Sequence, residues 1–268
     1  MSSTYIHGTN PAEQKRLSVM NSFLNDRSLQ QLALRGGERI LDLGAGLGQF
    51  SRAMARGSGV EVVGIERSEE QLGEAQRIAS LEGESHLVDF RRGDVLALDL
   101  KPQEWGSFDV VHTRFVLEHV SNPVAVVQSM VRAAKPGGRI VLEDDDHALM
   151  RLWPELPGFQ SLWDAYMNSY EAIGNDPNIG RKLVELLHKG GARPRANSWV
   201  FFGSCSGDPI FTTVVENLIG VLQTASEAIT TGSVSAERFE SVVTSLREWG
   251  MRPDAALWYP MAWAEGTK

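Results

Sequence analysis

Cysteine is nearly absent from the chain, since Cys205 is the only one in 268 residues. A single thiol allows no intramolecular disulfide and no cysteine-based zinc site. Long apolar runs are missing as well, because no hydrophobic stretch approaches the roughly 18 residues of a membrane span. The leader MSSTYIHGTNPAEQKRL is polar and lacks the apolar region of a signal peptide. These absences predict a cytoplasmic protein without a membrane span.

Clustered positive charge is also lacking. The 26 Lys and Arg residues stand against 34 Asp and Glu, which gives a net charge of -8. Nucleic-acid phosphates are bound by clustered cations, so a nucleic-acid partner is disfavoured. With 42% hydrophobic residues, a chain of this length can bury one sizeable core.

Short apolar runs alternate with helical segments over the first 150 residues. Strands are expected at 39–43, 60–66, 88–95, 108–113 and 139–144, and helices at 10–34, 49–56, 68–80 and 122–134. This alternation is typical of a parallel α/β sheet. The strands are almost continuously apolar, as expected where helices cover both faces of the sheet.

The pattern changes after residue 150. Helices are expected at 157–174, 178–191, 209–228 and 235–249, and strands at 196–204 and 255–266. Pro260 in the last strand predicts an edge strand or a bulge, because proline donates no backbone hydrogen bond. The predicted organisation is an N-terminal helical cap at 1–35 and a main domain at 36–268, with lid helices at about 151–195 and 205–250.

A glycine-rich loop, DLGAGLGQF, follows the first strand. Glycines let a ligand approach the backbone closely, and the helix N-terminus behind them favours an anionic group. The loop departs from the G-x-G-x-x-G/A spacing of dinucleotide sites, because Gln49 takes the third position, and it lacks the Gly-Lys-Ser/Thr of a P-loop. Glu66 ends the second strand 22 residues after Gly44, where a carboxylate can bind both ribose hydroxyls. Asp94 ends the third strand, where it can accept from an adenine amino group.

Five motifs, in this order, resemble those of class I S-adenosylmethionine-dependent methyltransferases of the small-metabolite or quinone type. They are ERILDLGAGLGQF, VVGIE, RRGDV, FDVVHTRFVLEHVSNP and KPGGRIVLEDDD, all within residues 36–146. A looser resemblance continues through GRKLVELLHKGGA at 180–192. The resemblance implies an α/β fold with a Rossmann-like seven-stranded sheet and helices on both faces. It also implies S-adenosyl-L-methionine as cofactor and S-adenosyl-L-homocysteine as product.

The same resemblance implies a cofactor site. The glycine loop would pack against the methionyl portion, with Asp42 near its amino group and Thr113 on the methyl-donor side. Related N-terminal helices close over the cofactor, which makes Tyr5, His7 and Arg16 candidates for closure and Arg16 a partner for the methionyl carboxylate. The predicted cofactor-binding residues are Tyr5, Arg16, Asp42, Gly44, Ala45, Gly46, Glu66, Arg67, Gly93, Asp94, Val95 and Thr113.

The segment HTRFVLEH carries part of a metal signature. In some quinone O-methyltransferases an acid followed by Glu-His binds a metal, and Glu118 and His119 match that pair. Phe115 stands where the first acid would be, so no metal is expected. His119 is then a packed or capping residue near the cofactor. Arg114 either pairs with an acid or faces the substrate, and both alternatives remain open.

The run LEDDDH ends the fifth strand with four acids and His147. Successive residues of an extended chain point to opposite faces, so at most two of these side chains converge, which also argues against a metal. We expect Glu143, Asp144 and His147 to form the catalytic rim on the acceptor side, and the other acids to be solvated. His147 has an ordinary pKa suited to a general base; the alternative is a solvated or packed position.

One helical stripe is aromatic. Phe159, Trp163, Tyr166 and Tyr170 follow one another at steps of four, three and four residues, so they share a face. That face either packs in the core or forms a lid over a flat or apolar substrate.

The predicted function is transfer of a methyl group from S-adenosylmethionine to an O, N or C atom of a small metabolite. The mechanism is in-line displacement at the sulfonium methyl, in which the protein mainly positions donor and acceptor. The alternative is a non-catalytic protein of the same fold that binds the cofactor and regulates or scaffolds a partner. We expect a monomer or a homodimer.

Overall fold

The computed structural model describes residue 21 and residues 24–232 and 234–268. The first half contains β1 (Ile40–Leu43), α2 (Gln49–Ser58), β2 (Val62–Glu66), α3 (Glu69–Leu81), β3 (Val88–Arg92), β4 (Phe108–Arg114), α4 (Pro123–Ala133) and β5 (Ala134–Asp145). The second half contains β6 (Arg151–Trp153), α5 (Phe159–Ala172), α6 (Leu183–Lys189), β7 (Arg193–Cys205), α7 (Phe211–Thr224), α8 (Ser226–Thr230), α9 (Ala236–Gly250) and β8 (Ala256–Thr267). Short 3-10 turns include η1 (Val95–Ala97), η3 (Leu117–His119), η4 (His147–Leu149) and η5 (Ile179–Lys182).

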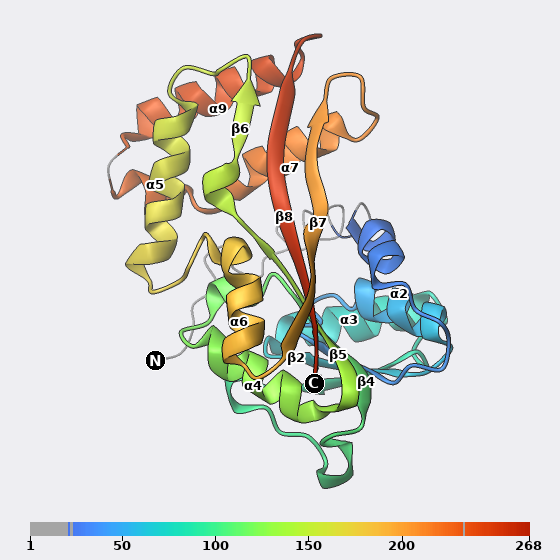
Figure 1. Cartoon of the computed structure of the whole chain (residues 1–268). Helices are drawn as coiled ribbons and strands as arrows, with labels where there is room; N and C mark the ends of the chain where they lie inside the picture. Colours follow the sequence, from blue (N-terminus) through green and yellow to red (C-terminus); the bar gives the residue numbers. More distant parts are fainter. Residues whose placement is uncertain (1–20, 22–23, 233) are drawn as a thin grey trace.

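All the strands belong to one mixed sheet. Its order is β3-β2-β1-β4-β5-β8-β6, with β7 also paired to β8. Strands β1 to β5 are parallel, and β8 runs antiparallel to β5, β6 and β7. The predicted Rossmann-like α/β class is therefore confirmed (Figure 1).

The predicted number of strands, seven, is one too low for the described residues, which form eight. Strand β7 pairs with β8 from Ala256 to Thr267 and so occupies one whole edge of it. Strands β5 and β6 must therefore share the other edge, where β5 pairs with residues 261–267 and β6 with residues 256–258. The extra strand continues the line of β5, and the sheet is still seven strands wide.

Alternate residues of the central strands point to opposite faces of the sheet. Ile40 and Val110 belong to a buried cluster that includes α2 and the helix at residues 24–32. Leu41 and Val111 belong to a second buried cluster, which includes α4 and α6. Helices thus cover both faces, as the continuous apolar runs predict.

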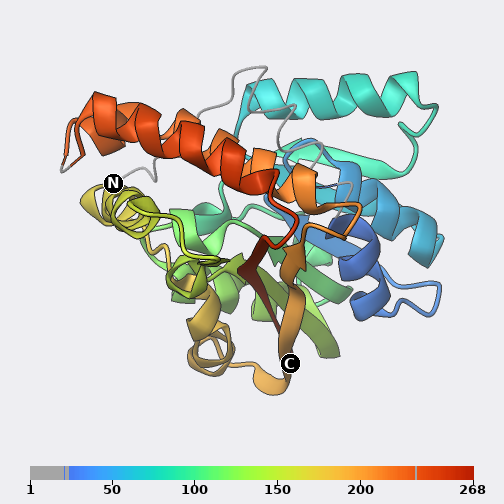
Figure 2. The ribbon, with the colours of Figure 1, turned by 90° about the horizontal axis from the view of Figure 1, so that it is seen from above.

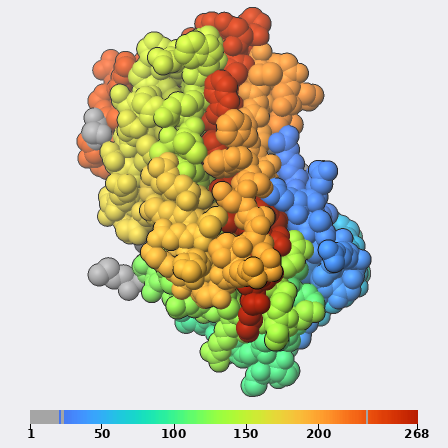
Figure 3. All heavy atoms as spheres, viewed as in Figure 1, coloured from blue at the N-terminus to red at the C-terminus, as the bar shows by residue number. Residues whose placement is uncertain are grey.

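The long strands β7 and β8 extend beyond the parallel strands and carry a second group of helices. Figure 1 shows α5, α7 and α9 around their upper ends, and Figure 2 shows α9 lying across α5. In the space-filling view β8 is a narrow stripe between the segment that contains α5 and α6 and the segment that contains β7 (Figure 3). The predicted division into cap, main domain and lid stays a prediction.

Pro260 lies in a bulge, which is one of the two alternatives, an edge strand or a bulge, that the sequence predicts. Its strand, β8, is paired on both sides. Opposite Pro260 the β7 register shifts between Phe201 and Gly203. On the other side, pairing to β5 ends at Met261 and pairing to β6 starts at Trp258. The missing N–H therefore falls in the gap between two ladders, where no strand needs it.

Two tryptophans on β8 allow a matched test of this core. Trp263 is 1% exposed and pairs with residues on both neighbouring strands, whereas Trp258 is 37% exposed. We expect Trp263→Ala to lower the free energy of unfolding by about 3–5 kcal/mol, because it removes a large side chain from a closed core. Trp258→Ala should have a much smaller effect in the same urea titration. Equal losses would contradict the central position of β8.

Candidate active site

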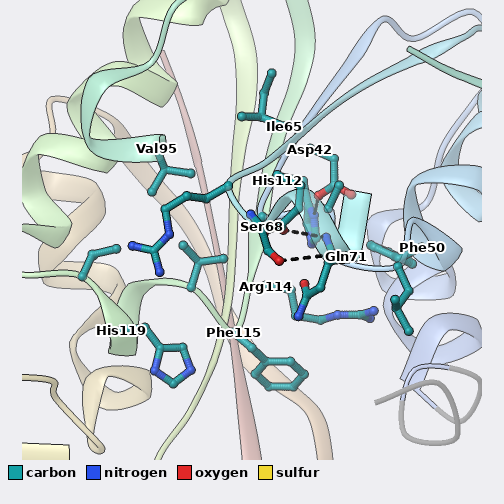
Figure 4. Close-up of a pocket in the computed structure, with 18 of the residues that line it drawn as sticks. Asp42, Phe50, Ile65, Ser68, Gln71, Val95, His112, Arg114, Phe115 and His119 are labelled. Atoms are coloured by element: carbon teal, nitrogen blue, oxygen red, sulfur yellow. Dashed lines mark hydrogen bonds and ion pairs between the residues drawn. The ribbon is translucent and has the colours of Figure 1, made fainter. Parts of the chain in front are cut away.

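A cavity of about 220 Å³ opens at the carboxyl ends of β1, β2 and β4 (Figure 4). Eight of the predicted cofactor-binding residues line it, namely Asp42, Gly44, Ala45, Gly46, Glu66, Arg67, Asp94 and Val95. The other lining residues include Asn21, Leu47, Phe50, Ser68, Gln71, His112, Arg114, Phe115, Val116 and His119. Ligands of open α/β sheets bind at this edge, so the cavity is the candidate active site.

The glycine loop lines the cavity and packs closely against Ile65 and Val116. Gly44 has a φ of 78°, which favours glycine, and its N–H donates to the Ile65 carbonyl at 2.8 Å. A Cβ at this position would lie 2.2 Å from Cγ2 of Val116. Only glycine fits there, and the backbone is left open to a ligand on its other side.

Glu66 is fixed by the backbone. Its Oε2 accepts from the Gly46 N–H at 3.0 Å, and its Oε1 accepts from the Ser68 N–H at 2.7 Å. An ionised carboxylate has about four acceptor positions, so about two remain for a ligand. Such a carboxylate can accept two hydroxyl donors at once, as a ribose diol requires.

Asp94 and Val95 line the opposite end of the cavity. Asp94 is exposed, and its Oδ1 accepts from the Leu96 N–H at 2.9 Å, which starts the turn η1. Two predicted cofactor residues lie outside the lining. Gly93 donates its N–H to the Glu66 carbonyl at 3.0 Å, and Thr113 donates its hydroxyl to the Leu43 carbonyl at 2.9 Å. These two residues support the strand ends, and their predicted contact with a cofactor stays a prediction.

A buried imidazole joins three strands behind the glycine loop. His112 Nδ1 lies 2.8 Å from Asp42 Oδ1, and its Nε2 lies 3.0 Å from Glu143 Oε1. Ser51 donates to Asp42 at 2.5 Å, and Ser28 donates to Glu143 at 2.7 Å. Burial disfavours a charge on His112, but the hydrogen bonds to the two carboxylates outweigh it and raise its pKa to about 8.

Arg114 faces the cavity and does not pair with an acid among the described residues. Its guanidinium donates to Ser28, Asn21 and Asn25 at 3.3, 3.1 and 2.8 Å. It also lies 4.4 Å from the centre of the Phe50 ring. Burial lowers the pKa of Arg114 from its ordinary value. Of the two alternatives that the sequence left open, a pair with an acid or a position facing the substrate, the structure favours the second, because Arg114 lines the cavity.

Phe115 and His119 line the cavity close to each other (Figure 4). Phe115 has a φ of 55°, a left-handed conformation that is uncommon for a bulky residue and concentrates at functional sites. His119 Nε2 lies 3.3 Å from Glu118 Oε1, and the ring stacks on Tyr170 with centroids 5.6 Å apart. The aromatic stripe of α5 thus packs in the core and reaches the cavity wall through His119.

The acidic segment at the end of β5 is buried, so the expectation that its remaining acids are solvated is wrong. Asp145 is 7% exposed and Asp146 is 0% exposed. Asp146 pairs with Arg181 at 2.5 Å, and Asp145 accepts from the Tyr259 hydroxyl at 3.3 Å. Both partners come from distant parts of the chain.

Asp144 is a buried carboxyl group with backbone partners. Its Oδ2 accepts from the Leu117 N–H at 2.9 Å. Burial, together with the nearby charges of Glu118 and Asp145, raises the pKa of Asp144 well above its usual range. Asp144 therefore holds the turn η3 in place through its hydrogen bond to the backbone.

His147 is enclosed by aromatic rings. The centroids of Trp163, Tyr166, Tyr170 and Tyr259 lie 5.4, 5.4, 5.5 and 5.9 Å from its own. Burial lowers the pKa of His147, but the hydrogen bond to Glu118 and the charges of Asp145, Glu118 and Asp146 together outweigh it, and the net shift is upward. None of the three predicted catalytic residues, Glu143, Asp144 and His147, lines the cavity. Their catalytic role stays a prediction, which this position behind the cavity wall does not favour.

Glu118, Asp145 and His147 form a group that could hold a metal ion, because one ligand atom of each lies within 4.8 Å of the others. All three are buried. Glu118 lies 3.3 Å from both His119 and His147, and these imidazoles hold its pKa well below the usual range although burial opposes the shift. The carboxylate of Glu118 thus has partners within the protein. The expectation of no metal stays a prediction.

Three candidates for closure, Tyr5, His7 and Arg16, lie outside the described residues. The sequence reading missed His112 as a functional residue. A signal for it exists in FDVVHT, where one titratable residue interrupts a buried apolar strand. Phe50 and Gln71 of the lining carry no such signal, because polar and aromatic residues are ordinary at helix starts.

The fold and the cavity define an α/β protein with a cavity at the carboxyl edge of its sheet. A methyltransferase-domain family model matches residues 34–191, so the chain belongs to that family. It is 40% identical over 129 residues to the ubiquinone biosynthesis O-methyltransferase of Xanthomonas campestris pv. campestris, a match that covers 48% of this chain and 52% of that protein. The chain thus spans about half the length of the curated relatives that it matches.

Two solved structures share the fold. The [4+2]-cyclase SpnF has a TM-score of 0.57 at 22% identity, covering 93% of this chain and 79% of that one. Geranyl diphosphate C-methyltransferase of Streptomyces coelicolor A3(2), in complex with Mg2+, geranyl diphosphate and S-adenosyl-L-homocysteine, has a TM-score of 0.54 at 16% identity, covering 93% and 78%. Within the described residues, the helices are too short or too polar for a bilayer span.

The His112 network predicts a pH dependence of stability. The pKa of His112 in the folded chain, about 8, lies above its ordinary value of 6.5, so the imidazolium stabilises the fold. This contribution, about 2 kcal/mol, is complete below pH 6.5 and is lost as the pH rises through 8. Urea titrations from pH 6 to 9 should show this loss in the wild type and not in His112→Gln. Parallel curves for the two proteins would contradict it.

The pairing of Glu118 predicts that no metal is required. The purified protein should contain substoichiometric metal by plasma mass spectrometry, and chelation should leave its unfolding temperature unchanged. Glu118→Gln should respond to chelation no differently from the wild type. One bound equivalent of metal, or a fall in unfolding temperature on chelation that Mg²⁺ reverses, would show that Glu118, Asp145 and His147 bind an ion.

Proposed function

We propose that the protein transfers a methyl group from S-adenosylmethionine to an O, N or C atom of a small metabolite. The observation that carries this proposal is the meeting of the glycine loop, Glu66 and Asp94 in one cavity of a methyltransferase-family chain. The three features are separated in sequence, and each of them alone is weak evidence for a cofactor site. Together they suit an adenosine that carries a short zwitterionic tail.

The residues fit the cofactor in a definite order. Asp94 and Val95 suit the adenine, Glu66 suits the ribose hydroxyls, and Gly44 leaves its backbone open to the methionyl part. Asp42 lies further along the same cavity, where a carboxylate suits an amino group. The resident cofactor supplies an electrophilic methyl group on a sulfonium, and the chain orients the acceptor against it.

The acceptor side of this proposal is the wall formed by Phe115 and His119. An O–H or N–H acceptor loses a proton, and a base must lie within hydrogen-bond reach of it. His119 lines the cavity and is oriented by Glu118 at 3.3 Å, whereas the predicted base His147 does not line it. We therefore propose His119 as the base where the acceptor requires one, in which case the contact of its Nδ1 with Asn175 Nδ2, 3.4 Å away, gives way to the proton.

The proposal also includes the class of substrate, the location in the cell and the oligomeric state. A net charge of -8 suits a small-molecule substrate better than a nucleic acid. One relative is a ubiquinone biosynthesis O-methyltransferase, which supports an acceptor of the small-metabolite class. The free, exposed thiol of Cys205 suits the reducing cytoplasm, and a monomer or a homodimer remains our expectation.

The second candidate function is binding of the cofactor without methyl transfer. One solved structure of this fold belongs to a [4+2]-cyclase, so the fold does not by itself specify methyl transfer. In this candidate the protein binds the cofactor and regulates or scaffolds a partner. Release of S-adenosyl-L-homocysteine in the presence of an acceptor separates the two functions.

Glu66 gives the direct test of cofactor binding. Calorimetry should show one S-adenosyl-L-homocysteine bound per chain. We expect Glu66→Gln to weaken binding at least about tenfold, because hydrogen bonds to a charged acceptor contribute about 1.5–3 kcal/mol each. Glu61→Gln is the matched control, since Glu61 is exposed beside the opposite end of β2. No binding by the wild type would refute the proposal, and unchanged affinity in Glu66→Gln would remove Glu66 from the site.

A further inference from the structure

The turn that follows β4 holds Phe115 in a strained conformation. Its φ of 55° lies in the left-handed region, which is unfavourable for any residue with a Cβ. The Phe115 N–H donates to the Glu143 carbonyl at 3.0 Å. The next two residues are fixed as well, since Val116 packs against the glycine loop and the Leu117 N–H donates to Asp144 Oδ2 at 2.9 Å. The surrounding structure therefore imposes this conformation on Phe115.

The turn places the Phe115 ring in the wall of the cavity, close to His119 (Figure 4). The ring is half-buried, so part of it is open to a ligand. Val116 and Val120, which flank the turn η3, also line the cavity. The wall around His119 is therefore apolar. A fixed aromatic face in such a wall favours a flat, apolar ligand, which packs against it by offset stacking.

Carboxylates are missing from this wall within the described residues. The described lining contains three carboxylates, all on the cofactor side of the proposed site, namely Asp42, Glu66 and Asp94. Glu118 does not line the cavity, and its carboxylate lies 3.3 Å from His147. An acceptor that binds through Mg²⁺, such as a vicinal diol, needs oxygen ligands on the wall that it meets. Phe115 offers a ring in their place.

We propose that Phe115 determines the specificity of the acceptor side. Its ring packs against the flat part of the methyl acceptor, and the acceptor presents a single O–H or N–H group to His119. Acceptors that bind through a metal ion held by two of their own oxygens are disfavoured. The assignment rests on the proposed function, because the acceptor is bound beside the cofactor.

Two ligands with the same skeleton and one hydroxyl group each probe the ring contact. 2-Naphthol is flat, and decahydro-2-naphthol is its saturated, puckered form. In calorimetry with the protein saturated with S-adenosyl-L-homocysteine, 2-naphthol should bind at least about tenfold more tightly than the saturated form. We expect Phe115→Leu to weaken binding of 2-naphthol at least about fivefold and of the saturated ligand less than about twofold, because leucine is apolar but not flat.

A third ligand tests the exclusion of chelating acceptors. 2,3-Dihydroxynaphthalene has the ring system of 2-naphthol and two adjacent hydroxyl groups. Its affinity for the same complex should be equal with and without Mg²⁺, because the wall supplies no carboxylate to the ion. A higher affinity in the presence of Mg²⁺ would show that the wall accepts a metal-bound diol, and would overturn this part of the assignment.

Urea unfolding tests the strained conformation without any ligand. Phe115→Gly should unfold at a higher urea concentration than Phe115→Ala, because glycine adopts a positive φ freely and alanine does not. Val116 is the matched control, since its φ of -120° is open to alanine, and there the alanine variant should be the more stable of the two. The same order of stability at both positions would contradict a strained Phe115.

The ligand measurements separate this inference from the proposed function. If the wild type does not bind S-adenosyl-L-homocysteine, the proposed function fails. If the wild type and Phe115→Leu both bind it, the variant is folded, and equal losses for the two naphthols, or no loss for either, refute the ring contact alone. Binding of neither naphthol by the wild-type complex would refute the flat acceptor.

Discussion

The imidazole of His112, held between the carboxylates of Asp42 and Glu143, ties together the three central strands at the edge where the cavity opens. A buried carboxylate without a partner is strongly disfavoured, so two of them can lie side by side only around a cation or donor. The same imidazole fixes Asp42 behind the glycine loop and Glu143 beneath the helix at residues 24–32. The shape of the cavity wall therefore depends on this one contact.

A second buried network lies next to that of His112, and in it two histidines share one carboxylate among aromatic rings. Glu118 contacts His119 and His147, and four aromatic rings enclose His147. The first network connects to the cavity through His112 and Arg114, and the second connects to it through His119. The acids at the end of β5 divide between the two, because Glu143 points to one and Asp145 to the other. This division explains why so many acids follow one another at the end of a single buried strand.

Much of the cofactor side could be predicted from the sequence because its motifs are local. The glycine loop, Glu66 and Asp94 each follow a strand directly, and parallel strands bring their carboxyl ends to one edge. The acidic run could not be read in that way. Asp146 is buried because Arg181 reaches it, and Asp145 because Tyr259 does, and neither partner is near in sequence. The eighth strand was missed because β6 has three residues, which is too short for a periodic signal. His112 could have been predicted as a functional residue, because it is a titratable residue inside an apolar strand.

The proposed function requires that this cavity hold an adenosine with a methionyl tail in one orientation. A crystal structure of the protein with S-adenosyl-L-homocysteine tests it most directly. We expect adenine beside Asp94 and Val95, the ribose hydroxyls on Glu66, and the amino-acid end beside Asp42. A ligand bound in the reverse orientation, or at a site away from the glycine loop, would contradict it.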